Sequence, residues 1–178
     1  MFIEANIRNP NQKEYLNCID GLEIKDLTNI NIFVGLNGIG KTSLLNFLYS
    51  SVLDTDYKKF YNPGDIKSHL PLKAEAFNCN NDVYICIDEI ENGLDISNLK
   101  LCAENIITIC KEHNNFQFFI VTHSLEFIDL LDDASLKQKF KNIAIYNITM
   151  TKLKGIQAYQ YSIDGIRHFI RYKTEFRN

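Results

Sequence analysis

The apolar residues of this chain follow two kinds of pattern, and each kind predicts a different element. Unbroken apolar runs of five or six residues are typical of strands buried on both faces of a sheet. Such strands are expected at 30–34, 83–87 and 116–121. Apolar residues three or four positions apart predict helices. These are expected from Thr42 to near Asp54, over 96–113, and from the cap residue Ser124 towards Phe140, with Leu136 on the inward face.

Weaker alternation of apolar and polar residues predicts four further strands. They are expected at 2–7, 22–27, 143–150 and 155–162. The stretch 54–82 has no clear period, and its turn residues at 62–65 together with Pro71 predict surface loops and short helices. The tail from Asp164 is expected to form a short basic helix.

The order of these elements predicts an α/β fold in one domain over residues 1–178. Strands that alternate with helices are joined by right-handed crossovers, which gives a mostly parallel sheet with helices on both faces. The two N-terminal strands are expected to form an antiparallel pair. A chain of this length buries enough surface to fold without disulfides or metals.

Composition narrows the class of protein. With 46% hydrophobic and 23% charged residues, the chain is similar to ordinary globular proteins. No apolar run approaches the roughly 18 residues of a membrane span, and the N-terminus has no secretion signal, so a cytoplasmic protein is expected. The five cysteines are odd in number and contain no Cys-x-x-Cys pair, which favours buried free thiols over disulfides, with a zinc site as the second interpretation.

The net charge of −3 hides an uneven distribution. Residues 1–133 hold 10 Lys and Arg against 20 Asp and Glu, a balance of −10, whereas residues 134–178 hold 9 against 2, a balance of +7. Such a basic segment can bind DNA, RNA or an acidic partner, or it can be a solvated face. Its basic residues are Lys137, Lys139, Lys141, Lys152, Lys154, Arg167, Arg171, Lys173 and Arg177.

The stretch after the first buried strand has the residues of a phosphate-binding loop. A glycine, four free positions and Gly-Lys-Thr fit the P-loop pattern between a strand and a helix. Glycine lets successive N–H groups point at one anion, and the helix N-terminus adds further N–H groups and its dipole. A chance glycine-rich turn is the alternative interpretation. The candidate phosphate-binding residues are Gly35, Leu36, Asn37, Gly38, Ile39, Gly40, Lys41, Thr42 and Ser43, with Lys41 reaching the β- and γ-phosphates and Thr42 binding Mg²⁺.

Polar residues also follow the other two buried strands. Asp88 and Glu89 come after one run, and His123 comes after the other. Because the carboxyl ends of parallel strands share one crevice, these residues are expected to meet at the phosphate loop. There Asp88 would hold Mg²⁺, Glu89 would polarise the attacking water and His123 would bond the γ-phosphate. Singly, an Asp-Glu pair is often a helix cap and a histidine a structural hydrogen-bonding residue.

These motifs resemble those of the ABC-type ATPases, and within them the small AAA ATPases related to the OLD (overcoming lysogenization defect) group and its SMC-like relatives. The resemblance is carried by INIFVGLNGIGKTSLLNFL from residue 30, VYICIDEIENGLD from residue 83 and FIVTHSLEF from residue 119. It implies ATP and Mg²⁺ as ligands, with Asp88 as the Walker B aspartate and Glu89 as the catalytic base. It further implies that residues 92–95 form the D-loop and that His123 is the switch histidine.

The stretch between the first two motifs is shorter than in that family. Only 88 − 41 = 47 positions separate Lys41 from Asp88, where the family holds a helical subdomain, a Q-loop glutamine and a Ser-Gly signature. The residues between Thr42 and Asp88 include no glutamine and no Ser-Gly pair. Because the signature closes over the γ-phosphate of a second subunit, the sequence does not predict the closed head-to-tail dimer of the family. No coiled-coil heptads or nuclease domain follow, so any output activity is expected in another chain.

Two classes of function fit these features. The first is an ATPase whose nucleotide state controls association with itself or with a partner protein, and Glu89 supports it because a pure binder needs no base. The second is a non-catalytic ATP-sensing module of a larger nuclease or defence-type complex, which the missing signature and glutamine support. A nucleotide kinase fits the spacing of Asp88 and Glu89 poorly, and a GTPase lacks the Asn-Lys-x-Asp guanine reader.

Overall fold

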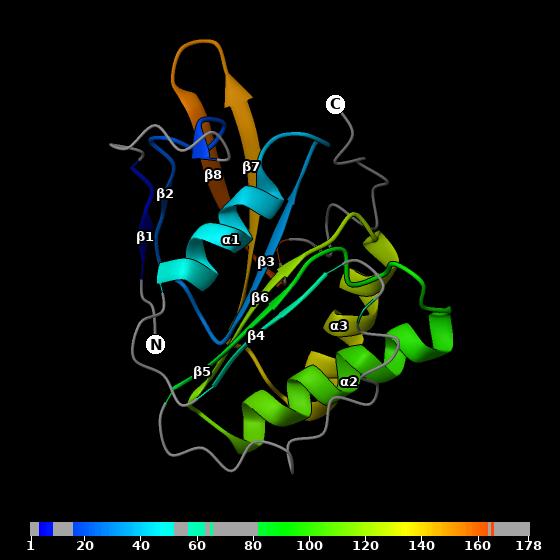
Figure 1. The fold of residues 1–178 in the computed structure, drawn as a ribbon. Coiled ribbons are helices and arrows are strands. Elements are labelled where there is room, and N and C mark those ends of the chain that lie inside the picture. The colour runs from blue at the N-terminus through cyan, green and yellow to red at the C-terminus, as the bar shows by residue number, and fades with distance from the viewer. Residues whose placement is uncertain are drawn as a thin grey trace.

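The computed structural model describes residues 4–8, 16–51, 57–62, 65, 82–163 and 165. These residues form one sheet of six strands and one of two (Figure 1). The large sheet has the order β4-β5-β6-β3-β7-β8. Its strands are β3 (Ile30–Gly35), β4 (Tyr57–Tyr61), β5 (Val83–Ile87), β6 (Phe116–Val121), β7 (Ile143–Thr151) and β8 (Gly155–Ser162). The small sheet pairs β1 (Ala5–Asn6) with β2 (Glu23–Ile24).

The large sheet is mostly parallel. Strands β4, β5, β6, β3 and β7 pair parallel with their neighbours, and β8 pairs antiparallel with β7. Strands β1 and β2 pair antiparallel. The predicted α/β fold, with a mostly parallel sheet and an antiparallel N-terminal pair, is therefore confirmed. Since β5, β6 and β3 are adjacent and parallel, their carboxyl ends lie along one edge of the sheet.

Helices cover both faces of this sheet, as predicted. Helix α1 (Lys41–Ser51) lies on one face, and helices α2 (Ile96–Glu112) and α3 (Leu125–Gln138) lie on the other (Figure 1). Side chains of β3 alternate between the two apolar cores. Ile30 and Ile32 pack with α2 and α3, whereas Phe33 packs with α1. This two-sided burial explains why the sequence of β3 is an unbroken apolar run rather than an alternating one.

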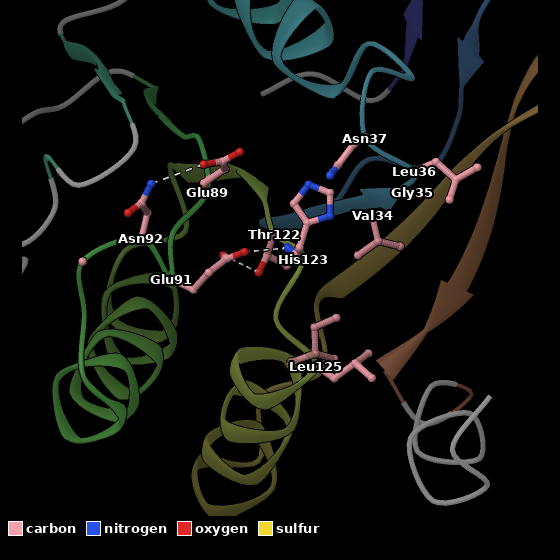
Figure 2. Close-up of a pocket in the computed structure, with 12 residues that line it drawn as sticks. Val34, Gly35, Leu36, Asn37, Glu89, Glu91, Asn92, Thr122, His123 and Leu125 are labelled. Atoms are coloured by element: carbon pink, nitrogen blue, oxygen red, sulfur yellow. Dashed lines mark hydrogen bonds between the residues drawn. The ribbon is translucent and has the colours of Figure 1, made fainter. Parts of the chain in front are cut away.

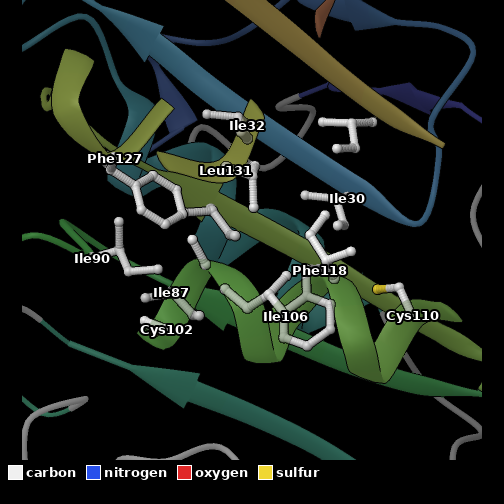
Figure 3. Close-up of a cluster of buried hydrophobic side chains, with 14 of the residues drawn as sticks. Ile30, Ile32, Ile87, Ile90, Cys102, Ile106, Cys110, Phe118, Phe127 and Leu131 are labelled. Atoms are coloured by element: carbon white, nitrogen blue, oxygen red, sulfur yellow. The ribbon is translucent and has the colours of Figure 1, made fainter. Parts of the chain in front are cut away.

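The core between the sheet and helices α2 and α3 contains side chains from the sheet and from both of these helices (Figure 3). Ile106 of α2, Phe118 of β6 and Leu131 of α3 are all fully buried there. Cys102 and Cys110 lie in the same core, and Cys86 is buried on the opposite face. These three thiols are free, as the cysteine count predicted. Cys79 lies outside the described residues.

Two predictions about helix α3 differ from the structure. The helix ends at Gln138, two residues before Phe140, because Lys139 takes a left-handed conformation with a φ of 56°. Leu136 is 54% exposed rather than inward. Ser135, four residues after Leu131 and therefore on the same side of the helix, takes the inward position and is 2% exposed.

The prediction of loops and short helices over 54–82 is wrong at residues 57–61. These residues form β4, an edge strand of the large sheet that pairs parallel with β5. The lysines at its centre interrupt the apolar pattern, so the sequence did not predict this strand. In the structure their ammonium groups lie over aromatic rings. Lys58 lies 4.8 Å from the ring centroid of Tyr49, and Lys59 lies 5.6 Å from that of Tyr61. The other residues of 54–82, apart from 62, 65 and 82, and the expected basic helix in the tail lie outside the described residues.

The remaining elements agree with the sequence in kind. Strands β5, β6 and β8 have the predicted bounds, and some of the other elements differ in length. Strand β2 is shorter than the predicted 22–27, and α1 begins at Lys41 and ends at Ser51. No helix in the described part of the chain has the length and apolar character needed to cross a membrane. The five described lysines of the basic segment, at 137, 139, 141, 152 and 154, are exposed, and its arginines lie outside the described residues.

Candidate active site

The loop between β3 and α1 has a backbone that its glycines make possible. Gly35 has a φ of 146° and Gly40 a φ of 101°, both outside the range of ordinary side chains. A Cβ at Gly35 would collide with the carbonyl oxygen of Ile148 on β7. A Cβ at Gly40 would lie 2.5 Å from Cγ2 of Ile19 and 2.8 Å from the Sγ of Cys18. The predicted strand-loop-helix unit is therefore present, and helix α1 begins at its end, so that the first N–H groups of the helix face the loop.

Lys41 is held inside this loop. Its side chain is only 5% exposed, and its Nζ donates hydrogen bonds to the carbonyl oxygens of Gly35 at 3.0 Å and Leu36 at 2.8 Å. Burial lowers the pKa of the ammonium group, and the nearby carboxylates of Asp88, Glu89 and Glu91 only partly oppose this effect. The loop thus contains a desolvated cation, which an added anion would stabilise.

Thr42 and Asp88 join the start of α1 to the end of β5. The Thr42 hydroxyl donates a hydrogen bond of 2.8 Å to Oδ2 of Asp88. The other carboxylate oxygen, Oδ1, is buried and has no hydrogen-bond partner among the described residues. Burial raises the pKa of Asp88, and the hydrogen bond from Thr42 opposes this only in part. A buried polar atom without a partner requires an explanation, and a role as a cation ligand is one such explanation.

The donor set of this pair fits Mg²⁺. A hydroxyl and a carboxylate are hard oxygen ligands, and Mg²⁺ bound with a nucleotide uses few protein ligands because it keeps several waters and takes phosphate oxygens. The described residues contain no group of three or more His, Cys, Asp or Glu side chains that could hold a metal alone. The residues present thus fit a metal that binds together with a phosphate group better than a closed metal site.

The chain turns sharply away from the direction of β5 at Glu89. Its φ of 47° is in the left-handed region, which costs a residue other than glycine roughly 1–3 kcal/mol. Two hydrogen bonds fix this turn: the N–H of Asn92 donates to the Glu89 carbonyl at 2.9 Å, and the N–H of Ile90 donates to the Val121 carbonyl at 3.3 Å. The turn brings the Glu89 side chain to the wall of a cleft, where the Asn92 amide lies 3.4 Å from its Oε2 (Figure 2).

The cleft lies beyond the carboxyl ends of the strands and has a volume of about 970 Å³. One part of its lining is polar and includes Glu89, Glu91 and His123, and another part is apolar. The apolar lining residues are Val34, Leu36, Leu125 and Ile128. Figure 2 shows the ring of His123 directed towards the loop that carries Asn37. The ends of β3, β5 and β6 thus meet as the sequence predicted.

The predicted site residues form two groups within this arrangement. Lys41, Thr42 and Asp88 are bonded to the loop or to each other, as described above, and do not line the cleft. Glu89 and His123 line the cleft together with the first residues of the loop, at 35–37. The structure therefore gives one group of side chains suited to phosphate and metal, and beside it a second group with a carboxylate and an imidazole.

Sequence reasoning missed one residue of this site. Glu91 accepts a hydrogen bond of 2.7 Å from the Thr122 hydroxyl at Oε2 and another of 2.7 Å from the His123 N–H at Oε1. The available signal was a third acidic residue within four positions of Asp88. Its role became visible only when the fold brought the residues after β5 and β6 together.

The stretch 92–95 contributes to two different parts of the structure. Asn92 and Gly93 line the cleft. Asp95 instead caps helix α2, since its Oδ1 accepts a hydrogen bond of 2.9 Å from the N–H of Asn98. The conformation of Asp95 is therefore explained by the helix that follows it.

Comparison with known proteins gives partial similarities. No family model matches the chain. An "ATP/GTP phosphatase" of Helicobacter pylori is 36% identical over 90 residues, which cover 43% of this chain. Two solved structures cover 85% of the chain: a model of ribosome-bound archaeal Pelota and ABCE1, with 14% identity and a TM-score of 0.48, and an RNase-L Inhibitor, with 17% identity and a TM-score of 0.47. The chain spans 24% of the phosphatase and 34% and 39% of these two structures.

Proposed function

We propose that this chain binds and hydrolyses a nucleoside triphosphate, with ATP as the first candidate, at the loop 35–42. The observation that carries the proposal is the bond between Thr42 and Asp88. It puts a hydroxyl at the start of the loop's helix on a buried carboxylate, and the second oxygen of that carboxylate has no partner among the described residues. With the desolvated ammonium group of Lys41 beside it, this arrangement suits a polyphosphate accompanied by a divalent cation.

In this proposal the loop and the start of α1 bind the phosphates. The backbone N–H groups of residues 35–43 donate to phosphate oxygens, and Lys41 neutralises the β- and γ-phosphates. Thr42 and Asp88 would hold Mg²⁺, which when bound offsets the negative charge of the phosphates. The burial of Lys41 and Asp88 strengthens these interactions, because charges interact more strongly where water is excluded.

Glu89 and His123 are the proposed catalytic residues. The carboxylate of Glu89 accepts a proton from the attacking water, since it lies in the cleft directly after Asp88 and is turned out of the strand. His123 donates a hydrogen bond to the γ-phosphate from the other side of the cleft. The apolar residues of the cleft limit the water that reaches these groups.

The comparisons support testing both purine nucleotides. The curated relative is named an ATP/GTP phosphatase, but it is matched over 24% of its length, so its substrates serve here only as candidates. The proposal includes a single domain and a closer relationship to the OLD-related ATPases. This relationship rests on the order of the three motifs in the chain. The same proposal assigns the nucleotide a regulatory role: its state controls association of the chain with itself or with a partner protein. The exposed lysines of the basic segment leave DNA or RNA as candidate partners.

The test compares binding and turnover of ATP and GTP in the wild type and four variants with Mg²⁺ present. Lys41→Ala should lose nucleotide binding, and Glu89→Gln should bind nucleotide but turn it over at least about 100-fold more slowly. Lys100→Ala and Glu126→Gln change exposed residues of α2 and α3 and serve as matched charge controls. Equal nucleotide affinity in wild type and Lys41→Ala would show that the loop is not the binding site. Equal turnover in wild type and Glu89→Gln would show that Glu89 is not the base.

A non-catalytic ATP-sensing module is the second candidate function. The absence of a glutamine and of a Ser-Gly pair between Thr42 and Asp88 favours it. Nucleotide binding without turnover in the wild-type protein would select this candidate. The mass of Glu89→Gln in solution, with and without Mg-ATP, then tests the regulatory role, because a nucleotide-controlled association with itself requires the mass to change.

A further inference from the structure

Glu91 has no role in the reaction proposed above, yet it makes the shortest polar contacts of the cleft. Its two carboxylate oxygens each accept one hydrogen bond of 2.7 Å, one from the Thr122 hydroxyl and one from the His123 N–H. Distances of this size are typical of hydrogen bonds to an ionised carboxylate. Figure 2 shows Glu91 between the turn that carries Glu89 and the residues that follow β6.

The contacts of Glu91 continue into helix α3. The Thr122 hydroxyl, which donates to Glu91, also accepts a hydrogen bond of 3.0 Å from the N–H of Ser124. The Ser124 hydroxyl in turn accepts a bond of 3.0 Å from the N–H of Phe127 and caps α3. Glu91 therefore connects the residues after β5 to the first turn of α3 through a chain of three hydrogen bonds.

A carboxylate is the one side-chain group that suits this position. Two donors point at residue 91, and a carboxylate offers two acceptors and no donor. A glutamine offers one acceptor oxygen, and its NH₂ group would face the other donor. Replacing Glu91 by glutamine therefore disturbs the connection even though the size and shape of the side chain stay nearly the same.

We infer that Glu91 is a positioning residue, which fixes His123 relative to Glu89 across the cleft. This inference rests on the proposed nucleotide hydrolysis. Glu89 lies two positions before Glu91 in the same turn, and the backbone of His123 is bonded to Glu91 directly. The side chains of Lys41, Thr42 and Asp88 are held by hydrogen bonds to the loop or to each other, and Glu91 acts on Lys41 and Asp88 only through its charge. Glu91 thus sets the geometry of the reacting groups, and the groups that bind the nucleotide are those of the loop.

The test measures kcat and nucleotide affinity separately. Glu91→Gln should lower kcat by about 10- to 100-fold, because small misplacements of reacting groups have effects of this order. It should not weaken nucleotide binding, because it removes a negative charge near Lys41. Thr122→Val, which removes the hydroxyl, should lower kcat in the same way, whereas Thr122→Ser, which keeps it, should restore wild-type turnover. The double variant of Glu91→Gln and Thr122→Val should lose less than the product of the single losses, because both interrupt one chain of bonds. Glu126→Gln removes an exposed carboxylate from the first turn of α3 and is the control.

A second readout separates this inference from the proposed function. The N–H of His123 should exchange slowly with solvent deuterium in the wild type and faster in Glu91→Gln, whether or not the protein hydrolyses a nucleotide. If the wild type hydrolyses no nucleotide, the proposed reaction fails, and the exchange experiment alone decides whether Glu91 holds His123. Unchanged kcat in Glu91→Gln, or equal exchange of the His123 N–H in both proteins, would overturn the inference.

Discussion

Asp88 is held in a position that destabilises its charged form. Burial raises the pKa of the carboxyl group above its ordinary value, and repulsion from Glu89 and Glu91 acts in the same direction. The carboxyl group of the unfolded chain therefore ionises at a lower pH than that of the folded chain. As pH rises through the interval between these two pKa values, the folded state loses stability, and the loss is complete above the folded pKa.

Removal of this carboxylate should stabilise the protein when nucleotide and Mg²⁺ are absent. We expect Asp88→Ala to raise the free energy of unfolding by about 0.5–2 kcal/mol, which corresponds to about 2–4 °C in Tm per kcal/mol for a chain of this size. The Thr42 hydroxyl, which loses its partner, is exposed and can bond to water. Thermal unfolding at several pH values measures the effect.

The pH dependence gives this prediction its control. The advantage of Asp88→Ala should shrink as pH falls and Asp88 in the wild type becomes protonated. Asp129→Ala, at an exposed position of α3, should show no comparable rise at neutral pH. A lower Tm for Asp88→Ala than for the wild type at neutral pH would contradict the assignment of Asp88 as a destabilising buried charge.

At the scale of single elements, the start of helix α2 depends on Asp95. Its Oδ1 accepts the N–H of Asn98, and its Oδ2 accepts the side-chain amide of the same residue, each at 2.9 Å. Loss of an N-cap of this kind costs about 1 kcal/mol. Asp95→Ala should therefore lower the Tm by about 2–4 °C, as measured by calorimetry.

The conservative variant distinguishes capping from a role in the reaction. Asp95→Ser keeps an N-cap hydroxyl and should retain most of the wild-type Tm. If Asp95→Ser has wild-type stability but loses nucleotide turnover, Asp95 has a function beyond the cap. If Asp95→Ala unfolds at the wild-type temperature, the cap does not stabilise α2 measurably.

The elements that the sequence predicted well are those with a strong local pattern. Strands β3, β5 and β6 have unbroken apolar runs, and α2 has apolar residues at helical spacing over four turns. Strand β4 was missed because its apolar pattern is weak. Its conformation is decided by pairing with β5, which lies later in the chain and leaves no signal in the local pattern. In each case the strength of the local signal matches the outcome.

The same distinction applies to the candidate site. Lys41, Asp88, Glu89 and His123 could be placed at one edge of the sheet because each follows a strand that the sequence identifies. Glu91 could not be assigned, because its partners Thr122 and His123 lie 31 and 32 positions later and their backbone direction is set by the fold. Contacts between two loops depend on tertiary structure and leave no periodic signal.

At the scale of the whole molecule, the accessibility of three cysteines measures how closely the cores on both faces of the sheet are packed. Cys86 lies in the core beside α1, and Cys102 and Cys110 lie in the core beside α2 and α3. Burial raises the pKa of Cys86 and of Cys102 to about 12, and it also raises that of Cys110. Their thiols are therefore both covered and protonated at neutral pH, which prevents reaction as thiolates.

Alkylation should accordingly spare these three thiols until the protein unfolds. Cys18, which is half-buried next to the phosphate loop, should react faster in the native protein and serves as the internal comparison. Peptide mapping by mass spectrometry after timed alkylation, with and without denaturant, measures each site. Rapid modification of Cys102 or Cys110 in the native protein would show that the core between the sheet and helices α2 and α3 is open.

The central place of β3 in the sheet also determines when the molecule can acquire its activity during synthesis. Both neighbours of β3 come much later in the chain: Ile30 pairs with Phe118, which is 118 − 30 = 88 residues away, and with Ile143, which is 143 − 30 = 113 residues away. Pairings of such long range make folding slow. During synthesis on the ribosome, β3, which carries the phosphate loop, therefore has neither neighbouring strand until β6 and then β7 emerge. A nascent chain that stops before β6 contains every residue of the loop but has no sheet to hold it.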